Sequence, residues 1–307
     1  MSTVAEKPLI CLGEALVDLI CPEPVADRSD ARRFEVHCGG ALANVAVAAR
    51  RAGAPAALAS ACGDDDRGRL IRSLLEAEGV DLRFYGVVPG APTAFAFAYL
   101  DLDREPFFEI HGAGIEAAIT SLAGREEEIA AAASAIVFGS NTLVDPAGRE
   151  VTLAICEQAR RLAVPLLFDP NLRPGRWPDR DAAREQCLPV LSEATVLKCN
   201  IGEARWLLAD ERVDAGAAAD ALHALGPELV VVTAGTAAAV CRGAAVAEAA
   251  PPDVELVSPL GAGDAFMGTL AAGLHAGGFD LSRAGDALTA AAEQGALACT
   301  HLGAFAS

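Results

Sequence analysis

Residues 258–270, SPLGAGDAFMGTL, place two glycines and an aspartate directly before an apolar run with helical spacing. Gly261 and Gly263 allow the backbone to turn tightly and to approach a ligand closely. The first N–H groups of a helix lack partners and carry partial positive charge, which suits an anion. The alternative is an ordinary helix start with Asp264 near the cap. This stretch therefore predicts either an anion site or a plain helix terminus.

The composition is that of a globular protein with a sizeable core. The chain has 307 residues, of which 52% are hydrophobic and 21% are charged. The formal net charge of −18, with no basic cluster, argues against a nucleic-acid surface. No apolar stretch of about 18 residues lacks a charge or a breaker, so we expect no membrane span, and the acidic N-terminus does not read as a signal peptide.

The nine cysteines and five histidines are scattered along the chain, and no C-x-x-C pair occurs. An odd number of unpaired cysteines in a long chain is typical of reduced, partly buried thiols. We therefore expect a cytoplasmic protein without a zinc site.

Short apolar runs alternate with amphipathic stretches along most of the chain. The runs expected as buried strands are 9–13, 56–60, 135–139, 165–169, 195–199 and 229–235, and the expected helices include 41–52, 66–78, 147–163 and 216–225. This alternation predicts an α/β fold with a doubly wound, mostly parallel sheet covered by helices on both faces. Ligands of such sheets bind beyond the C-terminal ends of the strands.

Two segments, 32–38 and 93–111, instead alternate with a period of two, and the second has a turn near 101–104. They predict a small separate β-sheet that acts as a lid or an interaction edge. We therefore expect a single domain over 1–307 with lid insertions at about 14–38 and 91–112. An exposed sheet edge also makes the lid a candidate homodimer surface.

Polar residues follow several of the expected strands. Gly39 and Gly40 open a helix with Asn44 in its first turn, where the backbone and an amide could meet a polar ligand. Asp18 follows the first strand between apolar neighbours, and a carboxylate there could hold two sugar hydroxyls. A turn with an exposed asparagine and a simple capping aspartate are the alternatives.

Two later segments carry further candidates. Asp169, Asn171 and Arg173 alternate, so they share one side of an extended segment. Asn200 and Glu203 are three residues apart and can converge at a helix start, where they could hold water around Mg²⁺. A capping box explains Glu203 equally well.

Six motifs together resemble the ribokinase-like (PfkB) family of sugar kinases in order and spacing, from about residue 9 to the C-terminus. They are GEALVD (13–18), GGALAN (39–44), FDPNLR (168–173), LKCNIGE (197–203), VVTAG (231–235) and GAGDAF (261–266). The resemblance implies transfer of the γ-phosphoryl group of ATP, with Mg²⁺, to a primary hydroxyl of a ketose, and it is nearest to fructokinases acting on fructose. A 2-keto-3-deoxygluconate kinase, a nucleoside kinase and a non-catalytic sugar- or nucleotide-binding homologue are the alternatives.

The resemblance also implies roles by position. Asp264 would be the catalytic base, and the amides of Gly261, Ala262 and Gly263 would form the anion hole. The substrate-binding positions would be Asp18, Gly39, Gly40, Asn44, Phe97 and Arg173. The nucleotide-binding positions would be Lys198, Asn200, Thr233 and Gly235, with Glu203 and Asn200 reaching Mg²⁺ through water.

One departure from the family pattern lies directly before the glycines. The family often has DTTGAGD, whereas this chain has SPLGAGD, so Ser258 replaces an acid and Pro259 a hydroxyl residue. That acid normally supports a monovalent-cation site, and a neutral oxygen offsets a cation's charge far less well. We therefore expect only weak activation by K⁺.

Overall fold

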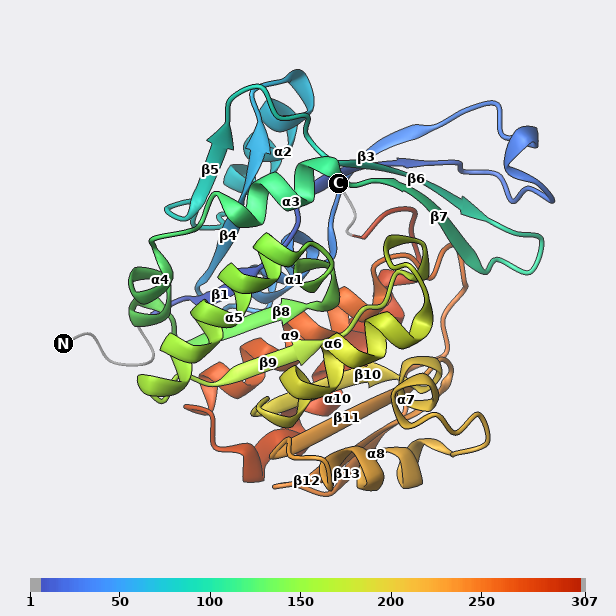
Figure 1. Cartoon of the computed structure of the whole chain (residues 1–307). Coiled ribbons are helices and arrows are strands. Elements are labelled where there is room, and N and C mark those ends of the chain that lie inside the picture. The colour runs from blue at the N-terminus through green and yellow to red at the C-terminus, as the bar shows by residue number, and fades with distance from the viewer. Residues whose placement is uncertain (1–6, 305–307) are drawn as a thin grey trace.

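The computed structural model describes residues 7–304, in which a nine-stranded sheet is joined to a separate four-stranded sheet (Figure 1). The large sheet has the order β13-β12-β11-β10-β9-β8-β1-β4-β5, in which β12 is antiparallel to both β11 and β13 and all other neighbours are parallel. Its strands are β1 (Leu9–Leu12), β4 (Ala56–Gly63), β5 (Tyr85–Val88), β8 (Ala135–Gly139), β9 (Leu166–Asp169), β10 (Val196–Asn200), β11 (Leu229–Ala234), β12 (Ala237–Gly243) and β13 (Ala247–Ala249).

Helices cover both faces of this sheet, because alternate side chains of each buried strand point to opposite sides. Leu9 and Cys11 of β1 join one apolar core, whereas Ile10 and Leu12 join the other. The first core is closed by α1 (Ala41–Arg51), α2 (Asp66–Ala77), α9 (Ala262–Ala276) and α10 (Ala284–Ala298). The second is closed by α3 (Ala113–Thr120), α4 (Glu126–Ala132), α5 (Pro146–Arg161), α6 (Arg180–Ser192), α7 (Ile201–Leu208) and α8 (Ala215–His223). The predicted fold class is confirmed.

The four-stranded sheet, called the lid here, projects from one side of the body (Figure 1). Its order is β3-β2-β6-β7, built from β2 (Leu16–Ile20), β3 (Glu35–Gly39), β6 (Phe95–Leu100) and β7 (Pro106–His111). The two segments with a period of two therefore do form strands of a separate sheet.

Side chains alternate between the two faces of the lid, and the strand register shows which residues share a face. Asp18 lies opposite Ala96, and its neighbour Leu19 lies opposite Phe97. We call the face with Asp18 and Ala96 the inner face and the face with Leu19 and Phe97 the outer face. Asp18 was expected just after a strand, but it lies in the middle of β2, because β1 ends at Leu12 and the chain enters the lid directly.

Four short 3₁₀ helices complete the described structure: η2 (Arg28–Asp30), η3 (Ser140–Leu143), η4 (Pro174–Arg176) and η5 (Leu281–Arg283). No helix within residues 7–304 is both long enough and apolar enough to cross a membrane. The nine cysteines form no disulfide, and all of them except Cys299 are buried.

Candidate active site

The helix α9 begins at the glycine motif, and its first turn carries Asp264. Gly261 has a left-handed backbone (φ +83°) and its Cα packs against Ala304, so a side chain at this position would clash. Among the described residues, the amides of Gly261 and Gly263 have no acceptor, whereas Ala262 N donates to Pro259 O at 3.3 Å. The helix start therefore presents two free N–H groups together with the positive end of the helix dipole.

Asp264 is not a helix cap, because its carboxylate is held between two side-chain amides. Asn44 Nδ2 of α1 donates to Oδ2 at 2.8 Å, and Asn171 Nδ2 donates to Oδ1 at 2.9 Å. Asn171 reaches this position from a left-handed backbone (φ +41°), which is uncommon for a residue other than glycine and is found at functional sites.

The environment of Asp264 makes it a stronger base than an ordinary aspartate. The residue is only 6% exposed. Burial raises its pKa to about 6, although the hydrogen bond from Asn44 and the nearby Arg173 act in the opposite direction. An oriented carboxylate that binds a proton near neutral pH is suited to general-base chemistry.

A buried ion pair lies beside the glycine turn. Lys198 Nζ of β10 donates to Asp169 Oδ2 of β9 at 2.8 Å, and both side chains are about 5% exposed. Burial alone would lower the pKa of Lys198, but Asp169 and Glu203 more than offset this, so its pKa is raised and the ammonium stays charged. A Cβ built on Gly263 would lie 3.1 Å from Lys198 Nζ, so this charge adjoins the free amides.

Asn200 and Glu203 form the capping box of α7. Asn200 Oδ1 accepts from Glu203 N at 2.9 Å, and Glu203 Oε2 accepts from Asn200 N at 3.0 Å. Glu203 Oε1 also accepts from Leu172 N at 2.7 Å, which fixes the loop that carries Asn171. The contacts of Asn200 and Glu203 are therefore those of a helix capping box. The described residues contain no group of three acidic, histidine or cysteine side chains that could hold a metal ion.

A polar pocket lies between Asp264 and the inner face of the lid. Its polar wall contains Asp18, Asn44, Arg173 and Asp264, together with Glu14 and Asn141, which the sequence analysis did not identify. Glu14 is 3% exposed, and its Oε1 accepts from Ala41 N at 3.2 Å and from Asn141 Nδ2 at 2.9 Å. The other carboxylate oxygen, Glu14 Oε2, is buried without a partner among the described residues.

Asp18 enters this pocket from β2. Burial raises its pKa to about 7, Arg173 lowers it, and the neighbouring Asp264 and Glu14 raise it further. Gly39 of β3 packs directly against the Asp18 carboxylate, where any side chain would clash. The expected positions Asp18, Gly40, Asn44 and Arg173 thus line one pocket, with Gly39 behind the carboxylate.

Three expected site residues lie elsewhere. Phe97 is on the outer face of the lid, edge-on to Phe34 at 5.0 Å, because the pleat turns Ala96 inward in its place. Thr233 pairs with Asn200 in the sheet register at the C-terminal end of β11, and Gly235 forms the exposed turn that follows (φ +61°). Thr233 and Gly235 therefore lie at the same edge of the sheet as Lys198 and Asn200.

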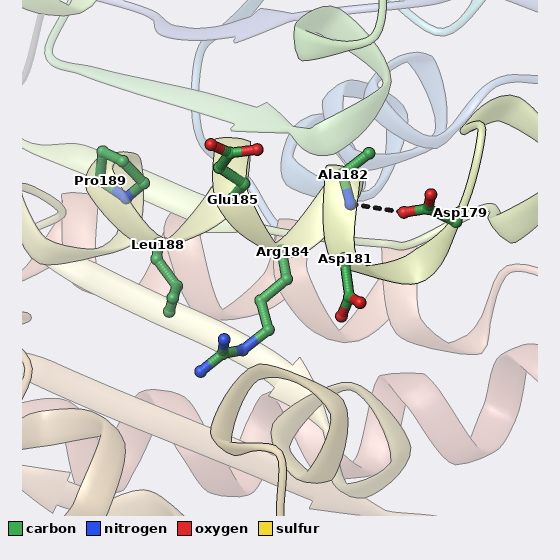
Figure 2. Close-up of a pocket in the computed structure, with 7 residues that line it drawn as sticks. All are labelled: Asp179, Asp181, Ala182, Arg184, Glu185, Leu188 and Pro189. Atoms are coloured by element: carbon green, nitrogen blue, oxygen red, sulfur yellow. Dashed lines mark hydrogen bonds between the residues drawn. The ribbon is translucent and has the colours of Figure 1, made fainter.

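Two further hollows lie among the described residues. One of about 860 Å³ runs along α6, where Asp179 accepts from Ala182 N and caps the helix (Figure 2). Glu185 and Asp181 point away from each other in Figure 2, and Arg184 donates to Leu207 O. A groove of about 590 Å³ lies between α1, α9 and α10. Alanines make up about half of its lining, and the polar side chains include Asn44, Arg51 and Gln294.

Comparison with known proteins identifies the family of this chain. Residues 7–307 match the pfkB family carbohydrate kinases. Probable fructokinase-4 of Arabidopsis thaliana is 31% identical over 269 residues, which are 86% of this chain and 82% of that protein.

Two solved structures share the fold over nearly the whole chain. The fructokinase of Xylella fastidiosa with bound ATP has a TM-score of 0.82 at 28% identity, covering 97% of this chain and 94% of that one. The double-mutant fructokinase of Vibrio cholerae O395, bound to fructose, ADP and potassium ion, has a TM-score of 0.83 at 25% identity, covering 99% and 95%. The chain therefore belongs to the pfkB family of carbohydrate kinases, which transfer a phosphoryl group to a sugar hydroxyl.

Proposed function

We propose that this kinase phosphorylates a primary hydroxyl of a neutral ketose, fructose being the best candidate, with ATP as the donor. The polar pocket supports the sugar class. Glu14 Oε2, Asn44 Oδ1 and Asn141 Oδ1 are all buried without partners among the described residues, and all three residues line the pocket. Leaving buried polar atoms unpaired is costly, so the ligand has to supply donors. Since all three atoms are acceptors, a ligand rich in hydroxyl groups fits them.

The charge of the pocket favours a neutral sugar over a sugar acid. Among the described residues that line the pocket, Glu14, Asp18 and Asp264 face a single cationic side chain, Arg173. Lys198 does not line the pocket and is paired with Asp169. The lid contributes only apolar side chains to the pocket besides Asp18, namely Leu16, Ile20, Ala96, Phe108 and Ile110. A ligand carboxylate would therefore meet three acids and no lid donor. Arg173 is the one feature that favours the alternative, a 2-keto-3-deoxy sugar acid.

The proposed chemistry follows from the positions of Asp264 and the helix start. As the sugar oxygen forms its bond to the γ-phosphorus, Asp264 takes the hydroxyl proton, and the bond to the bridging oxygen breaks to release ADP. The free amides of Gly261 and Gly263 and the ammonium of Lys198 stabilise the charge on the transferring group. ATP as the donor is supported by the similar Xylella fructokinase, which binds it.

The residues present also fit a Mg²⁺ ion held mainly by phosphate and water. Asp169 Oδ1 is buried without a partner among the described residues, and Glu203 has lone pairs beyond its two backbone contacts. Mg²⁺ commonly uses one or two carboxylates and keeps several waters. When bound, the ion would neutralise charge on the phosphates, and Asn200 would orient Glu203 through the capping box.

A coupled ADP-release assay over fructose, other neutral hexoses, 2-keto-3-deoxygluconate and nucleosides tests the proposal. We expect the highest kcat/KM with fructose. A higher value with the sugar acid would show that Arg173 outweighs the three carboxylates. A preference for a nucleoside, or no turnover with any acceptor, would refute the proposed function.

We also propose that two copies of the chain associate through the outer face of the lid. Phe34, Phe97, Tyr99 and Phe107 form a cluster of ring contacts on this face, and Val36 beside them is 58% exposed. Sedimentation of Val36→Asp beside the unmodified protein tests this. We expect a dimer that dissociates in the variant, and a monomeric unmodified protein would contradict it.

A further inference from the structure

The tip of the lid contacts the loop that leads into α9. Arg104, in the turn between β6 and β7, donates from Nη1 to Val257 O at 2.6 Å. The turn itself is fixed, because Asp101 Oδ1 accepts from the amides of Asp103 and Glu105 at 2.9 and 2.8 Å. Arg104 has a left-handed backbone (φ +63°) within this turn. The turn therefore holds the Arg104 guanidinium in place against the loop.

A second contact lies deeper under the lid. Leu260, directly before the glycine turn, is 8% exposed and packs with Ile20, Ala98 and Leu100. Phe108 of β7 and Leu302 pack against the same cluster. Because Ile20, Ala98 and Phe108 all lie on the inner face of the lid, Leu260 loses most of its apolar cover when the lid lifts from the loop.

The opposite side of the loop is held by the body. Cys299 O accepts from the amides of Val257 and Ser258 at 2.8 and 3.1 Å, and Ser258 Oγ accepts from Leu260 N at 3.2 Å. Gly261 then packs against Ala304. The loop over 257–261 is thus clamped between a fixed C-terminal segment and the lid.

We propose that Arg104 and Leu260 are positioning residues that couple closure of the lid to the geometry of the amides of Gly261 and Gly263. When the lid lifts, Val257 O loses its donor and Leu260 loses its apolar cover, so the loop relaxes and the amides lose their alignment. Phosphoryl transfer is then favoured only when the acceptor sugar is enclosed. This inference rests on the proposed role of these amides as the anion hole.

The test compares Arg104→Ala with Arg104→Lys, which can still reach the carbonyl, and with Leu102→Ala, a 71% exposed neighbour in the same turn. We expect Arg104→Ala to lower kcat about 3- to 10-fold, the effect of one charged hydrogen bond at an exposed position. Arg104→Lys should recover most of the rate, and Leu102→Ala should match the unmodified enzyme.

Hydrogen exchange of residues 257–264 provides a readout that does not require turnover. We expect faster exchange in Arg104→Ala than in the unmodified protein and in Leu102→Ala. Unchanged exchange in Arg104→Ala, or a kcat within about twofold of the unmodified enzyme, would overturn the inference. If the proposed function is wrong, the unmodified enzyme itself will phosphorylate no sugar. The exchange rates of Arg104→Ala and the unmodified protein can still be compared in that case, so the two failures are distinguishable.

Discussion

At the scale of single residues, the proposed catalysis depends on two carboxylates, Asp264 and Asp18, whose pKa values are raised by burial. Asp264, with a pKa of about 6, can accept the hydroxyl proton only when it is ionised. We therefore expect kcat/KM to be full above this pKa and to fall as the pH decreases through about 6. Asp18, with a pKa of about 7, accepts hydroxyl hydrogen bonds better as the anion, so the KM for sugar should rise below about pH 7.

Rates measured between pH 5 and 8 check this expectation. Because Asp264 and Asp18 interact, the two inflections belong to the pair. The variant Asp18→Asn should lose the KM inflection near pH 7 and keep the inflection of kcat/KM near pH 6. A profile that is flat over this range would contradict the assignment of both carboxylates.

Glu14 provides a second prediction at this scale. In Glu14→Gln, the amide oxygen can take the place of Oε1 and still accept from Ala41 N and Asn141. The amide nitrogen then takes the place of Oε2, so a donor replaces the unpartnered acceptor of the pocket. Since a hydrogen bond to a charged group contributes about 1.5–3 kcal/mol, we expect the sugar KM to rise about tenfold or more, with little change in the KM for ATP. An unchanged sugar KM would remove Glu14 from the binding site.

At the scale of elements, the loop before α9 has Ser258 where the family pattern often has an acid, and Ser258 makes contacts within the loop. Ser258 is fully buried and its Oγ accepts from Leu260 N, so its oxygen is already used. Pro259 fixes φ in the same turn. We expect weak activation by K⁺, measured as initial rates at constant ionic strength with K⁺ exchanged for a large organic cation. A strong, saturable dependence on K⁺, the ion bound by the similar Vibrio fructokinase, would contradict this.

The sequence predicts individual elements well but not what they contact across the chain. The period of two located the lid strands, yet it could not show which face points inward. A shift of one residue reverses the faces, and Phe97 accordingly lies outside while Ala96 faces the pocket. Glu14 and Asn141 are 127 residues apart, so their hydrogen bond appears only in the fold. The polar residues after the buried strand β8 were the available signal for Asn141.

At the scale of the whole molecule, the lid and the body enclose the pocket between them. Residues 32–38 and 93–111 should become protected from hydrogen exchange when sugar binds, because closure excludes water from the transfer. The strands of the large sheet serve as the internal control. Exchange in both segments that does not respond to the sugar would argue against closure, even if the enzyme is active.

The proposed chemistry requires Asp264 to remove the proton from the sugar hydroxyl beside the amides of α9. The most direct test is kcat of Asp264→Asn with the preferred sugar, because asparagine keeps the shape and its one oxygen can still accept from Asn44 or Asn171, but it cannot act as a base. Loss of a general base lowers the rate about 10²–10⁴-fold, and we expect a loss of this size with sugar binding retained by calorimetry. Near-normal turnover in Asp264→Asn would show that Asp264 is not the catalytic base.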